Sequence, residues 1–78
     1  MAAIRVYLVE DQPRLLRDLE RALSQRPGLR VVGTALDGET ALAELAGARP
    51  DVLVLDLELP GLSGLDVLER LSRAQVNV

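Results

Sequence analysis

The stretch Val52-Leu53-Val54-Leu55-Asp56 decides the fold, because an unbroken apolar run ends in one carboxylate. A strand with one face in water alternates apolar and polar residues, whereas a continuous apolar run is typical of a strand covered on both faces. Periodicity alone does not exclude a buried helix. The β-branched valines and the turn residues on either side, Arg49-Pro50-Asp51 and Leu59-Pro60-Gly61, favour a strand in a parallel sheet with helices on each face.

Similar patterns on either side of this run predict further strands. Residues 4–9 and 29–35 are rich in β-branched and apolar residues, and residues 76–78 resemble the opening of a fourth strand. Helical patterns separate these segments. The order β-α-β-α-β-α-β predicts an α/β fold with right-handed crossovers and a parallel sheet.

Three helices are predicted between the strands. The first has Pro13 in its first turn, the second has Asp37 as N-cap and stops at Gly47, and Ser63 with Asp66 resembles a capping box for the third. Their apolar stripes are expected to face the sheet. These stripes are Leu15, Leu16, Leu19, Ala22 and Leu23 in the first helix, Ala41, Leu42, Leu45 and Ala46 in the second, and Leu65, Leu68 and Leu71 in the third.

Composition narrows the class of protein. The chain has 78 residues, a net charge of −3, and neither cysteine nor histidine. It is long enough for one small domain with a modest core, without disulfides or Cys/His metal ligands to support it. No apolar stretch approaches the roughly 20 residues of a membrane helix, and no signal peptide is visible. The acidity argues against direct nucleic-acid contact, and the absence of cysteine is compatible with the cytoplasm.

Acidic residues follow two of the predicted strands. Glu10 and Asp11 come directly after the first strand, and Asp56 ends the third. If these strands are parallel neighbours, the three carboxylates meet at one edge. Two carboxylates about 4 Å apart repel by roughly 4 kcal/mol at an effective dielectric near 20, so the cluster requires a bound proton or cation. Oxygen ligands without histidine or cysteine favour Mg²⁺ or Ca²⁺, and Mg²⁺ also binds phosphoryl oxygens.

Each acid also has a structural explanation by itself. Asp11 precedes Gln12-Pro13 and could cap a helix, and Glu10 could be a solvated side chain. Asp56 is harder to explain in this way, because it ends a buried run with no helix pattern directly after it. Taken together at one edge, the three acids favour a functional site.

Three motifs in order resemble the receiver domain of two-component response regulators. They are Leu8-Val9-Glu10-Asp11-Gln12-Pro13, then Asp37-Gly38-Glu39, and then residues 52–64, Val-Leu-Val-Leu-Asp-Leu-Glu-Leu-Pro-Gly-Leu-Ser-Gly. The resemblance covers the whole chain and is strongest to receivers of the LuxR/NarL type. It implies a flavodoxin-like (CheY-like) three-layer fold whose complete parallel sheet has the order 2-1-3-4-5.

The resemblance also implies a role for each acid. Asp56 matches the aspartate that accepts a phosphoryl group from a sensor histidine kinase. Glu10 and Asp11 match the pair that holds Mg²⁺ beside it, and the backbone carbonyl of Glu58 matches a further ligand. Pro60 and Gly61 match the turn that shapes the loop. A carboxylate nucleophile at a strand end can accept phosphorus in line. Such a domain is a phosphoacceptor and not an enzyme.

The resemblance further implies a cytoplasmic location and an output domain, of the helix-turn-helix DNA-binding kind, that this chain does not contain. Receivers place a Ser or Thr after strand four and a Lys after strand five, whereas this chain has no lysine. We therefore expect residues 1–78 to be the N-terminal part of a single receiver domain. We also expect the chain to self-associate, through the strand at residues 52–55, the segment at 76–78 or the face beside the first helix.

Two other functions fit parts of the pattern. One is a receiver-like module used only for protein contacts, without phosphorylation. The other is a fragment of a haloacid-dehalogenase-type phosphatase, whose nucleophile also ends an apolar strand. That family has the pattern Asp-x-Asp, and here Glu58 occupies the position of the second aspartate.

Overall fold

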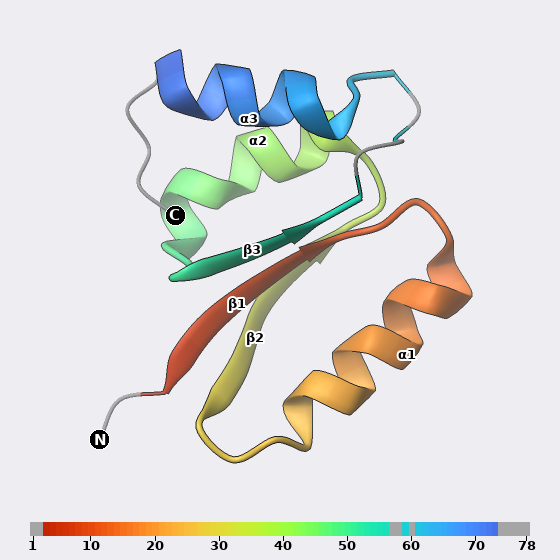
Figure 1. Cartoon of the computed structure of the whole chain (residues 1–78), viewed down its shortest axis with the longest axis vertical. Helices are drawn as coiled ribbons and strands as arrows, with labels where there is room; N and C mark the ends of the chain where they lie inside the picture. The colour runs from red at the N-terminus through yellow and green to blue at the C-terminus, as the bar shows by residue number, and fades with distance from the viewer. Residues whose placement is uncertain (1–2, 57–58, 60, 74–78) are drawn as a thin grey trace.

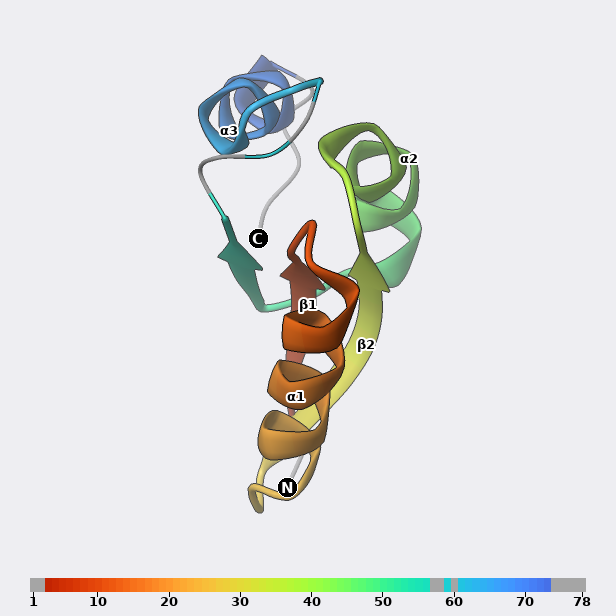
Figure 2. The same cartoon turned by 90° about the vertical axis from the view of Figure 1, so that its right-hand side faces the viewer.

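The computed structural model describes residues 3–56, 59 and 61–73. Within these residues the elements alternate, and each crossover between strands contains a helix (Figure 1). One helix covers one face of the sheet and two cover the other (Figures 1 and 2). The elements are β1 (Ile4–Val9), α1 (Pro13–Ser24), β2 (Leu29–Ala35), α2 (Gly38–Ala48), β3 (Val52–Leu55) and α3 (Gly64–Arg73). The predicted three-layer α/β fold is confirmed, and the strand expected at 76–78 lies outside the described residues.

The described strands form one parallel sheet in the order β2-β1-β3. This matches the first part of the expected order 2-1-3-4-5. Val9 at the end of β1 pairs with Ala35 of β2 and with Leu55 of β3, so the three strands finish together. The carboxyl ends of the strands therefore meet at one edge of the sheet, where open α/β folds place their sites.

The central strand β1 is covered on both faces. Tyr7 and Val9 face α2 and α3, while Val6 and Leu8 face α1, and all four are buried. The larger core lies on the α2–α3 side and contains Tyr7, Val9, Ala35, Ala41, Leu45, Leu59, Val67 and Leu71. On the α1 side, Leu16 packs against Val6 and Leu8, with Leu19, Leu23, Leu29 and Val31 around them.

In contrast, among the described residues β3 is covered on one face only, which corrects the expectation that both of its faces are covered. Leu53 and Leu55 pack against the α2–α3 core, but Val52 is 45% exposed and Val54 is 40% exposed. The reason is that α1 lies over β1 and β2 (Figure 1). The apolar run was correctly interpreted as a strand, although half of its side chains face solvent in the described structure.

The predicted apolar stripes also need correction: in α2, Ala46 was expected to face the sheet but is exposed, and the stripes of α1 and α3 differ further. In α1 the contact is made by Leu16, Leu19 and Leu23, while Leu15 is 41% exposed and Ala22 is also exposed. In α3 the buried residues are Val67 and Leu71, whereas Leu65 and Leu68 are exposed. Both helices carry two overlapping apolar stripes, and contact with the neighbouring elements selects one of them.

The ends of α2 depend on hydrogen bonds from side chains. At its start, Asp37 Oδ1 accepts the Thr40 N–H at 2.7 Å, as the predicted N-cap should. This bond lowers the pKa of the Asp37 carboxyl, because it stabilises the charged form. The predicted end at Gly47 is wrong, since the helix continues to Ala48 and ends at Arg49, whose φ of 50° is left-handed.

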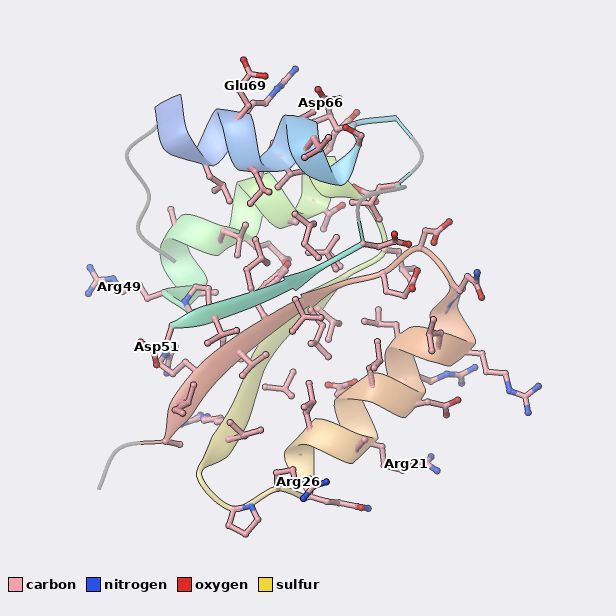
Figure 3. The ribbon with its side chains drawn as sticks, viewed as in Figure 1. Arg21, Arg26, Arg49, Asp51, Asp66 and Glu69 are labelled. Carbon is pink, nitrogen blue, oxygen red and sulfur yellow. The ribbon has the colours of Figure 1, made fainter. Side chains whose placement is uncertain are left out.

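Arg5 of β1 stabilises this later helix end. Its Nη2 donates to the Ala48 carbonyl at 2.6 Å, and its Nε donates to the Arg49 carbonyl at 3.1 Å. Its backbone N–H donates to Asp51 Oδ2 at 2.9 Å, which ties the start of β1 to the turn before β3 (Figure 3). The Arg5 guanidinium therefore donates hydrogen bonds to carbonyls at the end of α2 that have no donor within the helix. Among the described helices, none has the length and apolar character to cross a membrane.

Candidate metal centre

The site is positioned by the ends of β1 and β3. Asp56 follows β3, and its backbone N–H donates to the Val9 carbonyl at 3.1 Å. Glu10 follows β1, and its N–H donates to the Ala35 carbonyl of β2 at 3.1 Å. These bonds extend the parallel pairing one residue past the strands. The first acid after each strand is thus held by the sheet and not by a free loop.

The predicted acidic residues come together in the structure. Glu10, Asp11 and Asp56 each offer a carboxylate oxygen, and these oxygens lie within 4.8 Å of one another. Glu10 is 8% exposed, whereas Asp11 and Asp56 are half-buried. The fourth predicted ligand, the backbone carbonyl of Glu58, and the turn residue Pro60 lie outside the described residues.

Crowding of the acids perturbs the protonation of Glu10. The pKa of Glu10 is raised, first by a hydrogen bond between its carboxyl and that of Asp11, then by burial, and further by the negative charge of Asp56. Backbone N–H groups, including that of Gln12 at 3.2 Å from Glu10 Oε2, act in the opposite direction. The hydrogen bond to Asp11, the burial and the charge of Asp56 therefore all favour the neutral form of Glu10.

This donor set fits a hard divalent cation. All three side chains bind through oxygen, and the chain has no cysteine or histidine to attract a softer metal. A divalent cation would neutralise the negative charge of the cluster. Two of the acids are half-buried, so they can also reach water, which completes the coordination of Mg²⁺ in most protein sites.

The described residues just before α3 connect it to the core. Leu59 is buried in the core, and Gly61 adopts a φ of 73°, which glycine tolerates without strain. At the start of α3, the Ser63 N–H donates to Asp66 Oδ2 at 3.2 Å and the Asp66 N–H donates to Ser63 Oγ at 3.1 Å (Figure 3). The predicted capping box is therefore confirmed.

Sequence reasoning missed the part that Gly38 plays near this segment. The sequence predicted Asp37 as the N-cap of this helix, but the next residue, Gly38, is buried and packs directly against Leu62 and Val67. A glycine placed directly after an N-cap, inside a helical pattern, is the only trace of this contact in the sequence.

Comparison with known proteins agrees with this geometry. The family described as the response regulator receiver domain matches residues 6–78. The chain is 41% identical over 73 residues to the protein-glutamate methylesterase/protein-glutamine glutaminase of Geobacillus kaustophilus, covering 94% of this chain and 21% of that protein. It thus spans about a fifth of the length of that relative.

Solved structures show the same arrangement of strands and helices. The signal receiver domain of the response regulator NarL from Mycobacterium tuberculosis has a TM-score of 0.91 and 33% identity, over 97% of this chain and 61% of that chain. A LuxR-family two-component response regulator from Aurantimonas sp. SI85-9A1 has a TM-score of 0.87 and 32% identity, over 94% of this chain and 52% of that chain. The protein belongs to the receiver domain family of two-component response regulators.

Proposed function

We propose that Asp56 accepts a phosphoryl group from a sensor histidine kinase, beside a Mg²⁺ ion held by Glu10, Asp11, Asp56 and the backbone carbonyl of Glu58. The observation that carries this proposal is the convergence of three carboxylate oxygens within 4.8 Å at the ends of neighbouring strands. A cluster of that kind favours a divalent cation, and Mg²⁺ commonly binds phosphoryl oxygens together with one or two carboxylates.

Differences among the three acids support Asp56 as the nucleophile. Glu10 is buried, its pKa is raised and its Oε2 accepts the Gln12 N–H, so this carboxylate is both less charged and less accessible. Asp11 shares a hydrogen bond with Glu10. Asp56 is half-buried at the end of β3, where backbone pairing with Val9 fixes its position.

In the proposed transfer, an Asp56 carboxylate oxygen attacks phosphorus in line. A phosphorus–oxygen bond forms, the phosphorus–nitrogen bond of the phosphohistidine breaks, and the imidazole leaves with the bonding electron pair. The cation supplies charge neutralisation at the phosphoryl oxygens. Glu10 and Asp11 would serve to hold that charge next to Asp56.

The test is labelling of the full-length protein by a small phosphodonor such as a phosphoramidate, followed by intact mass. We expect one phosphoryl group per chain, acid-stable and base-labile as acyl phosphates are, and none in Asp56→Asn. Asp18→Asn is the matched control, because Asp18 is exposed on α1 outside the cluster. Labelling that survives Asp56→Asn would place the acceptor elsewhere.

Two competing functions would give different results in the same assay. A receiver-like interaction module would not be labelled at all. A phosphatase would release phosphate from a small phosphoester with repeated turnover, whereas we propose a single phosphoacceptor and no enzyme activity for this segment. The sequence Asp56-Leu57-Glu58 lacks the second aspartate of the haloacid-dehalogenase pattern, which argues against the phosphatase.

We further propose that residues 1–78 are the N-terminal part of one cytoplasmic receiver domain that controls a separate output domain. This chain spans 52–61% of the two receiver-containing structures described above. The LuxR-family neighbour supports a helix-turn-helix DNA-binding output, and the net charge of −3 argues against nucleic-acid contact by this segment itself. Binding of promoter DNA by the full-length protein, with and without phosphodonor, tests the output.

Self-association is proposed for the isolated 78-residue chain. Within the described sheet β3 is an edge strand, and Val52 and Val54 expose apolar surface beside its unpaired side. Such an edge can pair with another chain. Sedimentation at micromolar concentration should show a dimer or larger assembly, and a folded, cooperatively melting monomer would contradict the proposal.

A further inference from the structure

Asp11 is of the residue type that often caps a helix, yet it does not cap α1. The helix begins at Pro13, and its N-cap is Gln12, whose backbone is extended with φ −92° and ψ 110°. The Gln12 carbonyl accepts the first intrahelical hydrogen bond, from the Leu16 N–H at 2.9 Å. In the described structure of this helix the Gln12 side chain makes no capping hydrogen bond. Aspartate is favoured as a cap and glutamine is not, so α1 starts later than capping preference alone would place it.

Pro13 accounts for this later start. The ring of a proline clashes with the N–H and Cβ of the preceding residue when that residue is helical, so Pro13 keeps Gln12 extended. If Asp11 were the N-cap, Gln12 would be the first helical residue and would need the conformation that the ring disfavours. Pro13 would then be the second helical residue, and it has no N–H to donate to an Asp11 carboxylate oxygen. Both effects prevent Asp11 from capping α1.

The segment before Pro13 is thereby available to the acidic cluster. The chain bends at Asp11, and the Gln12 N–H donates to Glu10 Oε2 at 3.2 Å. The Asp11 carboxyl is hydrogen-bonded to that of Glu10, and the cluster with Asp56 has its oxygens within 4.8 Å of one another. An N-cap residue is instead extended, and its carboxylate faces the N–H groups of its own helix. Asp11 would therefore need a different conformation to cap α1 than the one it has in the cluster.

We propose that Pro13 is a positioning residue of the metal centre. By fixing the start of α1, it keeps the Asp11 carboxylate beside Glu10 and Asp56. Pro13 is itself exposed and offers neither a ligand nor a charge. The body of the helix is held to the sheet by other residues, chiefly the buried Leu16. The inference rests on the proposed function, since it concerns the ligands of that same cation.

The chain offers a matched control and a compensating variant. Pro13→Ala removes the restriction on Gln12 and supplies an N–H at position 13, so Asp11 can compete as the N-cap. Pro27→Ala is the control, because Pro27 is exposed in the turn beyond the opposite end of α1. Gln12→Ser in the Pro13→Ala background is the compensating variant. Serine is a favoured N-cap, so it should restore the helix start while it keeps the backbone N–H that bonds to Glu10.

The experiment makes two measurements on the full-length protein. Calorimetric titration gives the Mg²⁺ affinity, and backbone carbon chemical shifts in EDTA report whether residue 12 is extended or helical. We expect Pro13→Ala to make residue 12 helical and to weaken Mg²⁺ binding about tenfold, the lower end of losses seen when groups supporting metal ligands are changed. Pro27→Ala should change neither quantity. Pro13→Ala/Gln12→Ser should return residue 12 to the extended form and recover most of the affinity.

A folded Pro13→Ala protein with unchanged Mg²⁺ affinity would overturn the inference. Weaker binding while residue 12 stays extended, or weaker binding that Gln12→Ser does not recover, would also overturn it. So would a Pro13→Ala protein that fails to fold, since the inference gives this exposed proline no part in the core. If the unaltered protein binds no Mg²⁺, the proposed function fails and the inference with it. If it binds Mg²⁺ and Pro13→Ala binds equally well, the inference alone fails.

Discussion

Replacing Asp11 by Asn should stabilise the folded protein when no divalent cation is present. Asp11 contributes one of three carboxylate oxygens that lie within 4.8 Å of one another. Asparagine has the same shape and keeps an oxygen that can accept the hydrogen bond from Glu10, but it carries no charge. The substitution therefore removes repulsion with little change in packing.

The size of the effect follows from this separation. At 4.8 Å, two unit charges repel by about 3.5 kcal/mol at an effective dielectric of about 20, and by about 0.9 kcal/mol in bulk water. Asp11 is half-buried, which places each pair between these limits. The hydrogen bond between Glu10 and Asp11 already offsets part of one of these two repulsions. We expect Asp11→Asn to raise the free energy of unfolding by about 1–3 kcal/mol in EDTA.

In Mg²⁺ the stability advantage of Asp11→Asn over the unaltered protein should become smaller. A cation that binds only the folded state, present at ten times its Kd, adds about 1.4 kcal/mol to the free energy of unfolding. Asp11→Asn removes a charged ligand, so it should gain distinctly less from the same Mg²⁺ concentration. Urea unfolding followed by far-UV circular dichroism, in EDTA and in Mg²⁺ at equal ionic strength, measures both effects.

An exposed aspartate outside the acidic cluster provides the control. Asp18→Asn removes one charge from the exposed face of α1, and it should change stability by no more than about 0.5 kcal/mol in either buffer. An Asp11→Asn protein that is no more stable than the unaltered one in EDTA would show that the acids do not repel as described. An equal gain from Mg²⁺ would show that Asp11 is not a ligand.

Three further predictions concern the rest of the structure. Burial, and then the 2.5 Å hydrogen bond to Glu44, raise the pKa of Tyr7 above its ordinary 10.0, so its stabilisation is fully present below pH 10 and is lost as pH rises, by about 1.4 kcal/mol per pH unit. Because Tyr7 is the sole tyrosine, tyrosinate absorbance should appear only together with unfolding, and earlier ionisation would contradict this. Leu45→Ala should cost about 2–5 kcal/mol in urea unfolding, since Leu45 is fully buried, whereas Leu68→Ala, at a position 46% exposed, should cost far less. Arg5→Met keeps the apolar stem but removes the donors to the last carbonyls of α2, and it should cost about 1–2 kcal/mol, with faster amide exchange at that helix end.

The sequence by itself determined the strands and their alternation with helices, and its resemblance to receiver domains supplied the sheet order that brings the acids together. Residues 4–9, apart from Arg5, and residues 52–55 are apolar over the length of a strand, and that property belongs to the local pattern. Placing helices between them forces a parallel sheet. Once β1 and β3 are neighbours, the residues directly after them must meet, so Glu10, Asp11 and Asp56 could be predicted without coordinates.

The tertiary structure alone decided which face of each helix is buried and where α2 ends. In α3 the sequence allows the stripe containing Leu65 and Leu68 as readily as the one containing Val67, and only contact with α2 distinguishes them. The left-handed end of α2 at Arg49 is stabilised by Arg5, which is far away in the chain. Periodicity specifies the spacing of apolar residues, but it does not specify the neighbours that cover them.

The same limit applies to the site. The sequence predicted which acids meet, but not that Glu10 is buried and hydrogen-bonded to Asp11. It also did not predict that Gly38 lies against Leu62 and Val67. Desolvation and close approach arise only when segments distant in the chain pack together. The local sequence thus determines which acids follow the strands, whereas the raised pKa of Glu10 and the spacing of the three carboxylates are properties of the assembled fold.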